Sequence, residues 1–248
     1  MTTPTPSVDA AYAKFEALGE TEQRLAVDAM RREAVRRCAA DGLFFLQFVK
    51  TRDEADPEQS VKPFPLYLDY LRETWREVST NQVTAIVKSR QLLLSWVMCC
   101  FAVHWARFKP NQYVVWQTQN DDDANKMVSM AGGDKDATYL GRMQFIEKNL
   151  PKWLQVPIRD VEGSIGYPNG SMIEALPGGA NKVRSKVPSL YIGDEFAMQD
   201  EAKGVWTSLA PLVQKGSKVV LISTPNGADG NMFYHLWHGT PYRNPTSG

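Results

Sequence analysis

Apolar residues recur at helical spacing along the first part of the chain. The segment 20–41 shows this most clearly, and the apolar positions that repeat along it are Val27, Met30, Ala34 and Cys38. Apolar residues three or four positions apart share one face of a helix, so a helix is predicted here. Two later apolar segments, 43–49 and 63–75, predict further helices, with a charged linker between them. Residues 1–62 are therefore expected to form a helical lead-in, whose Thr- and Pro-rich start is expected to be disordered.

The pattern changes after Asn81, where short apolar runs alternate with longer helical ones. Strands are predicted at 83–87, 112–118, 189–193 and 218–223, and helices are predicted up to about Phe108 and at 121–131 and 139–150. Pro-Asn-Gly inside the segment 164–176 predicts a β-hairpin. Strands that alternate with helices are typical of an α/β fold with a mainly parallel sheet. Residues 63–248 are therefore expected to form an α/β core with helices flanking the sheet.

Composition narrows the class of protein only a little. The chain has 28 basic and 28 acidic residues, and a nucleic-acid binder usually carries a basic excess because phosphate neutralisation supplies much of its affinity. Any contact with DNA would therefore need a local patch, another domain or another subunit. The three cysteines lack metal-ligand spacing, and their odd number argues against a disulfide framework. We see neither a secretion signal nor an apolar run of roughly 20 residues, so a cytoplasmic protein with no membrane contact is expected.

The loop after the first predicted strand, residues 88–95, reads Lys-Ser-Arg-Gln-Leu-Leu-Leu-Ser. A phosphate-binding loop lies at this place, between a strand and a helix, and its usual pattern is Gly, four residues, then Gly-Lys-Ser/Thr. On that spacing Lys88 takes the place of the first Gly, Leu93 that of the second Gly and Leu94 that of the Lys. Only Ser95 matches the pattern. Taken alone, the loop is therefore better interpreted as an ordinary turn.

Two further strand ends carry polar groups. Asp194 and Glu195 follow one buried strand, and in nucleotide hydrolases such an Asp orders Mg²⁺ while the Glu positions the attacking water. A helix N-cap explains such a pair about as often. Residues 223–227, Ser-Thr-Pro-Asn-Gly, follow the last strand and form a plain turn when taken alone. Because ligands of open α/β sheets bind beyond the carboxyl ends of strands, the three polar strand ends together fit one ATP site.

Read together, these motifs resemble the terminase large subunits, which are viral DNA-packaging motors. The resemblance rests on SRQ-x-x-x-S at 89–95, IGDEFA at 192–197 and LISTPNG at 221–227, supported by NMFYHLW and WQTQNDDDANKMV. It covers roughly residues 60–240. It implies a P-loop NTPase fold of the RecA-like, ASCE type, with ATP and Mg²⁺ as cofactors.

The resemblance also implies a role for each motif. The nucleotide is expected to be held by the loop residues Lys88, Ser89, Arg90, Gln91, Leu92, Leu93, Leu94 and Ser95. Ser95 and Asp194 are expected to hold Mg²⁺, and Glu195 is expected to act on the water. A coupling turn that senses the nucleotide and signals to DNA would consist of Ser223, Thr224 and Asn226.

The loop departs from the family pattern in two ways. Some members carry the lysine at the start of the loop, and Lys88 fits that variant because its long side chain can reach the β- and γ-phosphates. Leu93 stands where the family usually has Gly, which permits positive φ and close backbone approach. A degenerate module that does not hydrolyse ATP and serves assembly is therefore an alternative. Another translocase, such as a helicase, is a second alternative, but it should carry a second motor-like domain.

Several other side chains are candidates for the site. Arg90 stands where the family often has an arginine that responds to the γ-phosphate, and a surface salt bridge explains it equally well. Arg184 is a candidate arginine finger for a neighbouring subunit. Phe64 and Tyr67 are candidates for cradling adenine, and helix packing accounts for them as well. The candidates for a DNA contact lie along the predicted first helix and are Arg31, Arg32, Arg36 and Arg37. A solvated helix face is the preferred interpretation of these residues.

The resemblance implies partners as well as chemistry. It implies that ATP hydrolysis drives double-stranded DNA into a procapsid in the cytoplasm of an infected host cell. The expected partners are double-stranded DNA, the terminase small subunit, the portal protein and further copies of the chain in a ring, with a monomer in isolation as the alternative. The metal-dependent nuclease half of the family has no counterpart in this sequence, so no DNA cleavage is expected from it.

Overall fold

Among the residues that the structure describes, seven strands form one sheet. The computed structural model describes residues 13–52, 60–89, 92–118, 138–161, 163–227 and 231–239. The strands are β3 (Val83–Val87), β4 (Tyr113–Gln117), β5 (Arg159–Val161), β6 (Ser164–Gly166), β7 (Met172–Leu176), β8 (Leu190–Asp194) and β9 (Lys218–Ser223). Their spatial order is β3-β9-β8-β4-β7-β6-β5. Neighbours from β3 to β7 are parallel, and β7, β6 and β5 are antiparallel, so the predicted mainly parallel sheet and the hairpin are confirmed.

The order of the strands brings the polar strand ends together. β9 lies between β3 and β8, although it is the last strand in sequence. Val87 pairs with Ser223, and Asp194 pairs with Ile222. Because these strands are parallel, the loop after β3, the acidic pair after β8 and the turn after β9 all leave the same edge of the sheet.

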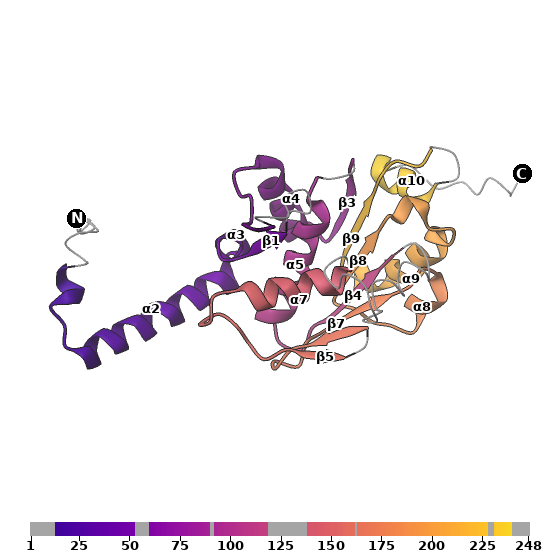
Figure 1. Ribbon diagram of the computed structural model, residues 1–248. Helices are drawn as coiled ribbons and strands as arrows, with labels where there is room; N and C mark the ends of the chain where they lie inside the picture. Colours follow the sequence, from indigo (N-terminus) through magenta and orange to yellow (C-terminus); the bar gives the residue numbers. More distant parts are fainter. Residues whose placement is uncertain are drawn as a thin grey trace, which may run out of the picture.

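Helices cover both faces of the sheet (Figure 1). One core cluster includes residues from α2 (Glu20–Ala40), α3 (Gly42–Leu46), α4 (Asp69–Thr80), α5 (Leu94–Phe108) and α7 (Tyr139–Asn149). The other includes residues from α8 (Ala180–Arg184), the 3₁₀ turn η2 (Phe196–Met198), α9 (Ala202–Gln214) and α10 (Met232–His238). Strand residues alternate between the clusters, as Trp116 and Val115 do in β4, because successive strand side chains point to opposite faces.

The N-terminal helices begin outside the core and end inside it. Figure 1 shows α2 extending away from the sheet, with only its last part near the body. Cys38, near the end of α2, and Phe45 and Leu46 in α3 are buried in the same cluster as α5. This part of the lead-in therefore shares its core with the sheet.

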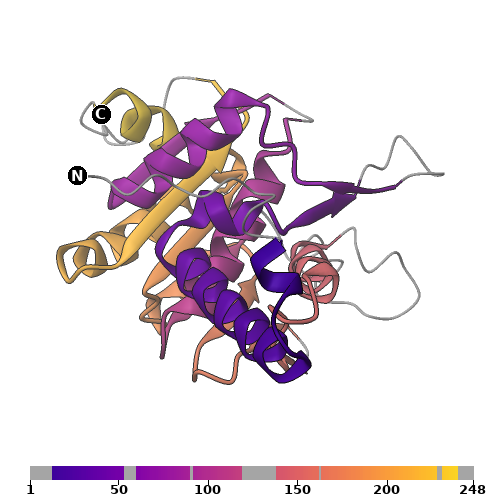
Figure 2. The ribbon, with the colours of Figure 1, turned by 90° about the vertical axis from the view of Figure 1, so that its left-hand side faces the viewer.

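The segment predicted as a helix from residue 63 starts differently. Residues Lys50–Arg52 form strand β1 and residues Val61–Pro63 form strand β2, which pair antiparallel and extend from the body beside α7 (Figure 2). Helix α4 begins only at Asp69. Pro65 accounts for part of the delay, because a proline disfavours helical backbone in the residue before it.

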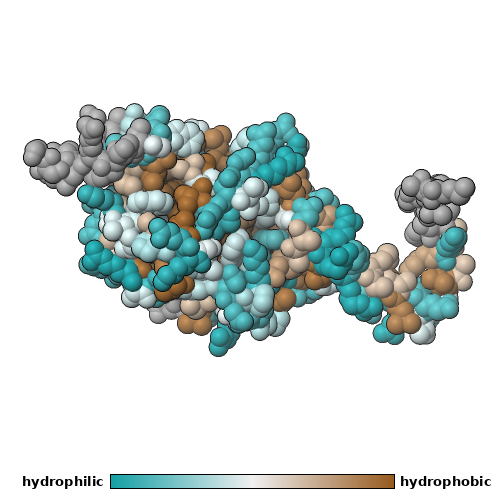
Figure 3. Space-filling model, turned by 180° about the vertical axis from the view of Figure 1, so that it is seen from behind, coloured by the Kyte–Doolittle hydropathy of each residue, from teal (hydrophilic) through white to brown (hydrophobic). Residues whose placement is uncertain are grey.

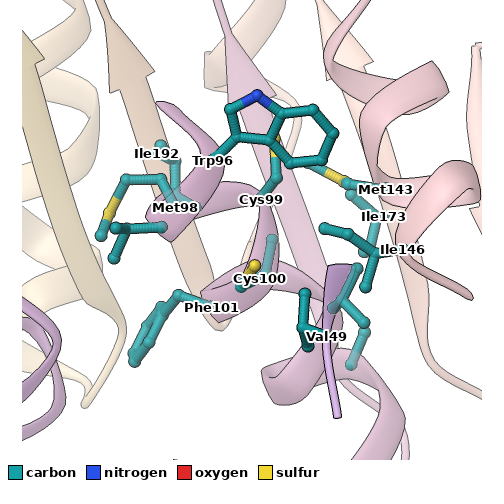
Figure 4. Packing of buried hydrophobic residues seen from close by; sticks show 14 of the residues in the cluster. Val49, Trp96, Met98, Cys99, Cys100, Phe101, Met143, Ile146, Ile173 and Ile192 are labelled. Atoms are coloured by element: carbon teal, nitrogen blue, oxygen red, sulfur yellow. The ribbon is translucent and has the colours of Figure 1, made fainter. Parts of the chain in front are cut away.

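Helix α5 is buried along most of its length and organises the larger core. Cys99 and Cys100 pack among Trp96, Met98 and Ile146, as Figure 4 shows, so the interpretation of this pair as buried packing is confirmed. The face in Figure 3 is mostly hydrophilic, with apolar residues scattered over it. Within the described residues, no helix combines the length and the apolar character that a membrane span requires.

Candidate functional site

A buried ion pair joins the loop after β3 to the acidic pair after β8. The Lys88 Nζ atom lies 2.9 Å from Asp194 Oδ1 and 3.3 Å from Glu195 Oε1. The exposed fraction of the side chain is 10% for Lys88, 1% for Asp194 and 33% for Glu195. Two charged strand ends that lie 106 residues apart in sequence therefore meet in a place largely removed from water.

The local charges stabilise the ionised forms of Lys88 and Glu195. Burial by itself would lower the pKa of Lys88, but the negative charges of Asp194 and Glu195 outweigh it and raise that pKa above its usual value. Burial would likewise raise the pKa of Glu195, but the Lys88 charge and hydrogen bonds from Thr224 lower it overall. At neutral pH the site therefore contains an ammonium group beside an ionised glutamate.

The turn after β9 holds the other side of Glu195. Both the backbone N–H and the hydroxyl of Thr224 donate to Glu195 Oε2, at 3.2 and 3.0 Å. The buried Ser223 hydroxyl accepts from Ala197 N at 3.0 Å, and Asn226 Nδ2 donates to the Ala197 carbonyl at 3.0 Å. The predicted coupling residues are thus hydrogen-bonded to Glu195 and to the residues just after it.

Two residues at the site adopt left-handed backbone conformations. Leu93 has a φ of 56° and Glu195 a φ of 47°. A non-glycine residue in this region costs of the order of 1–2 kcal/mol, and such strain concentrates at functional sites. Leu93 thus has a positive φ that a glycine would adopt without strain. For Glu195, the same conformation accompanies the sharp change of direction after β8.

The loop residues fall into different environments. Ser95 lies half-buried in the first turn of α5, and Ser89 and Leu92 are exposed. Leu94 is a buried core residue, so a lysine at that position would enter the core rather than reach a phosphate. Arg90 and Gln91 lie outside the described residues, as does the helix predicted at 121–131.

Helix α5 begins without a capping side chain among the described residues. Its N-cap is Leu93, which offers no side-chain hydrogen bond. The first N–H groups of a helix have no partner inside the helix, and together with the helix dipole they favour an anion. The N-terminus of α5 directly follows the loop that contains Lys88. The N–H groups of the helix and the Lys88 ammonium group are therefore close together in sequence at this edge of the sheet.

The two candidates for cradling adenine differ in exposure. Phe64 is 5% exposed and belongs to the core, which agrees with the helix-packing interpretation, whereas Tyr67 is 80% exposed. The nearby Tyr70 hydroxyl donates to the Leu92 carbonyl at 3.2 Å, which ties the start of α4 to the loop.

The arginine candidates among the described residues lie on helix surfaces. Arg184 is exposed on α8 and donates to Asn181 Oδ1 at 3.1 Å. The DNA candidates Arg31 and Arg36 form ion pairs with Asp28 and Glu33 of their own helix, as expected for a solvated face.

One residue of the site escaped the sequence analysis. The Tyr139 hydroxyl, from the first residue of α7, donates to Asp194 Oδ2. Burial and the Asp194 charge raise the pKa of Tyr139 well above its usual value, so the hydroxyl stays protonated and acts as the donor. Tyr139 lies far from Asp194 in sequence, and a tyrosine at the start of a helix carries no motif that would have singled it out.

The donor atoms at the site suit Mg²⁺. Among the described residues, no group of three or more His, Cys, Asp or Glu side chains gathers to hold a metal ion. Mg²⁺ in nucleotide sites is usually held by one or two protein oxygens together with phosphate oxygens and waters. The Asp194 carboxylate at the end of β8 and the Ser95 hydroxyl at the start of α5 are donors of that kind.

We expect Lys88→Met to lower the free energy of unfolding by about 3–5 kcal/mol at pH 7, because it leaves buried Asp194 without its cation. Lys186→Met is the matched control: Lys186 pairs with Glu174 in a more exposed position, so its loss should cost about 1 kcal/mol or less.

The effect of Lys88→Met should depend on pH. Since the pKa of Glu195 is lowered, the contribution of its pairing with Lys88 is present above the ordinary value of 4.5 and is lost as the pH falls through the lowered pKa. Urea unfolding at several pH values should therefore show the Lys88 effect shrinking in acid. Equal effects of the two substitutions at pH 7 would contradict this assignment.

Solved structures of two phage proteins share this architecture. The large terminase of bacteriophage HK97 superposes with a TM-score of 0.52 at 13% identity, over 82% of this chain and 40% of that one. The large terminase of a thermophilic bacteriophage gives a TM-score of 0.51 at 14% identity, over 68% of this chain and 41% of that one. No protein-family model matches the sequence. The predicted fold is therefore confirmed: the chain has the α/β fold found in phage large terminases and corresponds to less than half the length of those proteins.

Proposed function

We propose that this chain is the ATPase domain of a phage terminase large subunit, which hydrolyses ATP to drive double-stranded DNA into a procapsid. The main support is the contact of Lys88 with Asp194 and Glu195, and of Glu195 with Thr224, at one edge of the sheet. These residues come from the ends of three adjacent strands, where open α/β sheets bind their ligands. The chain spans 40% of the HK97 protein, so we infer the activity of a whole packaging motor as part of this proposal.

The triphosphate would bind over the start of α5. The unpaired N–H groups of that helix favour an anion, and Lys88 supplies a charge that can move from the carboxylates to the β- and γ-phosphates. Ser89, Gln91 and Arg90 would complete the loop, and Tyr67 offers an exposed ring for the adenine base. Ser95 and Asp194 would hold Mg²⁺, which supplies charge neutralisation for the phosphate oxygens.

Glu195 would act on the attacking water. Its lowered pKa leaves it ionised at neutral pH, and its Oε2 atom is oriented by the two hydrogen bonds from Thr224. The water would lose its proton to Glu195 as it attacks the γ-phosphorus, and ADP would leave. Charge that develops on the transferred group would be stabilised by Lys88 and by an arginine, for which Arg90 and Arg184 are the candidates.

The turn at 223–227 would couple hydrolysis to movement. Thr224 contacts Glu195 directly, so any shift of the carboxylate toward a water or phosphate alters that contact. Asn231 Nδ2 donates to the Asn226 carbonyl at 2.7 Å, and Asn231 caps α10 through Phe233 N. A path of hydrogen bonds thus leads from the glutamate to the start of α10.

The partners of the motor belong to the same proposal. A ring of subunits would translocate double-stranded DNA, together with a terminase small subunit and a portal protein, in the cytoplasm of the infected host. Arg184 is exposed, as a residue that serves a neighbouring site must be. We propose that residues 1–248 do not by themselves cleave DNA.

A non-hydrolysing assembly module is the second candidate. The observation in its favour is the loop itself, because Leu93 occupies a left-handed position suited to glycine and Leu94 is buried in the core. A leucine side chain at position 93 hinders close approach of the backbone to phosphates. Nucleotide binding decides between the two candidates.

We expect the parent chain to bind ATP in calorimetry and Lys88→Met to bind it about 10- to 100-fold more weakly, since a charge-assisted hydrogen bond contributes about 1.5–3 kcal/mol. Lys186→Met removes a lysine that pairs with Glu174 instead of Asp194 or Glu195, so this variant should bind like the parent. Circular dichroism at the working temperature checks that each variant is folded. If the folded parent does not bind ATP, the assembly module becomes the favoured function; if Lys88→Met binds as the parent does, Lys88 is not the phosphate-binding lysine.

We expect Glu195→Gln to keep ATP binding and to lower the steady-state rate of hydrolysis about 10²–10⁴-fold, because the amide preserves the shape but cannot accept the proton. Glu73→Gln, at an exposed position in α4, is the control and should leave the rate unchanged. Phosphate release measures the rate and calorimetry the binding. A Glu195→Gln rate within about threefold of the parent rate would show that Glu195 is not the base.

We expect hydrolysis to rise steeply with protein concentration if Arg184 serves the neighbouring subunit. Arg184→Ala and Glu195→Gln should each be inactive alone and should regain activity when mixed, because one interface then pairs an intact Glu195 with an intact Arg184. Phosphate release from the mixture, with association followed by light scattering, makes the test. Two folded, associating variants that show no recovery would argue against an arginine supplied in trans.

A further inference from the structure

The Asp194 carboxylate has almost all of its hydrogen-bonding capacity assigned within the described residues. Its Oδ1 atom accepts from Lys88 Nζ at 2.9 Å and from Glu195 N at 3.0 Å. Its Oδ2 atom accepts from the Tyr139 hydroxyl. An ionised carboxylate offers about four acceptor sites, so one position on Oδ2 remains, next to the Tyr139 bond.

Tyr139 is fixed by contacts with elements on either side of it. Its ring stacks on Trp116 of β4, with centroids 4.5 Å apart and planes 30° apart. Its carbonyl accepts from Cys99 Sγ of α5 at 3.9 Å, and α7 lies beside α5 on the same face of the sheet (Figure 1). Thr138 caps α7 by accepting from Gly141 N at 2.8 Å. The position of the hydroxyl therefore depends on these packing contacts as well as on Asp194.

Lys88, the other side-chain donor to Asp194, has a different role. In the proposed function Lys88 moves its charge toward the phosphates when ATP binds, and Asp194 then loses the bond to Nζ. Tyr139 and the backbone N–H of Glu195 remain. An acceptor position on Oδ1 then becomes free as well, beside the one on Oδ2. The backbone N–H contacts only Oδ1, so the tyrosine is the donor that fixes Oδ2.

We propose that Tyr139 is a positioning residue for the metal-binding carboxylate: its hydroxyl holds Asp194 Oδ2 in the orientation that receives Mg²⁺ when Lys88 turns to the nucleotide. This inference rests on the proposed function. Tyr139 itself touches neither nucleotide nor metal and acts through Asp194. Hydrogen-bond partners of metal ligands typically change metal affinity by about 10–100-fold when they are removed.

The test is Tyr139→Phe, which keeps the ring against Trp116 and removes only the hydroxyl. Calorimetry measures ATP affinity without metal and at rising Mg²⁺ concentrations, and Mn²⁺ electron paramagnetic resonance reports the bound metal directly. We expect unchanged metal-free ATP binding and an about 10–100-fold higher metal concentration for half-saturation of the ATP complex. Tyr191→Phe is the matched control, because it removes a buried hydroxyl on β8 that bonds Gln117 instead of Asp194. That variant should keep the metal dependence of the parent.

A double-mutant cycle separates positioning from general stability. In an Asp194→Asn background, Tyr139→Phe should change metal dependence no further, since the residue through which it acts is gone. If Tyr139→Phe lowers only the melting temperature, or tightens metal binding, the positioning role is overturned while the ATPase proposal stands. If the parent binds no ATP with or without metal, the proposed function fails and this inference fails with it.

Discussion

The site depends on an ammonium group enclosed by two carboxylates. Lys88 is 10% exposed and Asp194 1% exposed, so water hydrates neither side chain well, and removing one member of the pair leaves the other without its partner in a buried place. The pair joins the first strand of the sheet to the third in spatial order, across β9. In the proposed function, phosphate oxygens would replace the carboxylates as the partner of Lys88, so its charge would stay paired when ATP binds.

The sheet order makes this enclosure possible. β9 is inserted between β3 and β8, so its terminal Ser223 and the following Thr224 lie between the loop and the acidic pair. Thr224 restrains Glu195 from one side while Lys88 contacts it from the other. Tyr139, from the start of α7, fixes the second oxygen of Asp194. Each acidic side chain is thus oriented by residues from at least two other elements, and such preorganisation is what the proposed phosphoryl transfer would require.

Two non-glycine residues at the site have a strained backbone. Leu93 and Glu195 both adopt positive φ, and neither is a glycine. At Leu93 the side chain packs partly against the larger core, which offsets some of the strain. In the proposed ATP site the same side chain would oppose close approach of a phosphate, and this conflict separates the two candidate functions.

Local sequence determined much of this protein. Pro-Asn-Gly was enough to predict the β6–β7 hairpin. Short continuous apolar runs were enough to predict β3, β4, β8 and β9, because strands of a parallel sheet covered by helices carry such a signature. The same signature placed Lys88, Asp194, Glu195, Ser223 and Thr224 at strand ends. Three things depended on tertiary structure: the burial of Leu94, the ion pair of Lys88 and the contact of Tyr139 with Asp194. Each follows from which strands become neighbours and how α5 and α7 pack on them, and such long-range pairing leaves no periodic trace in the residues themselves.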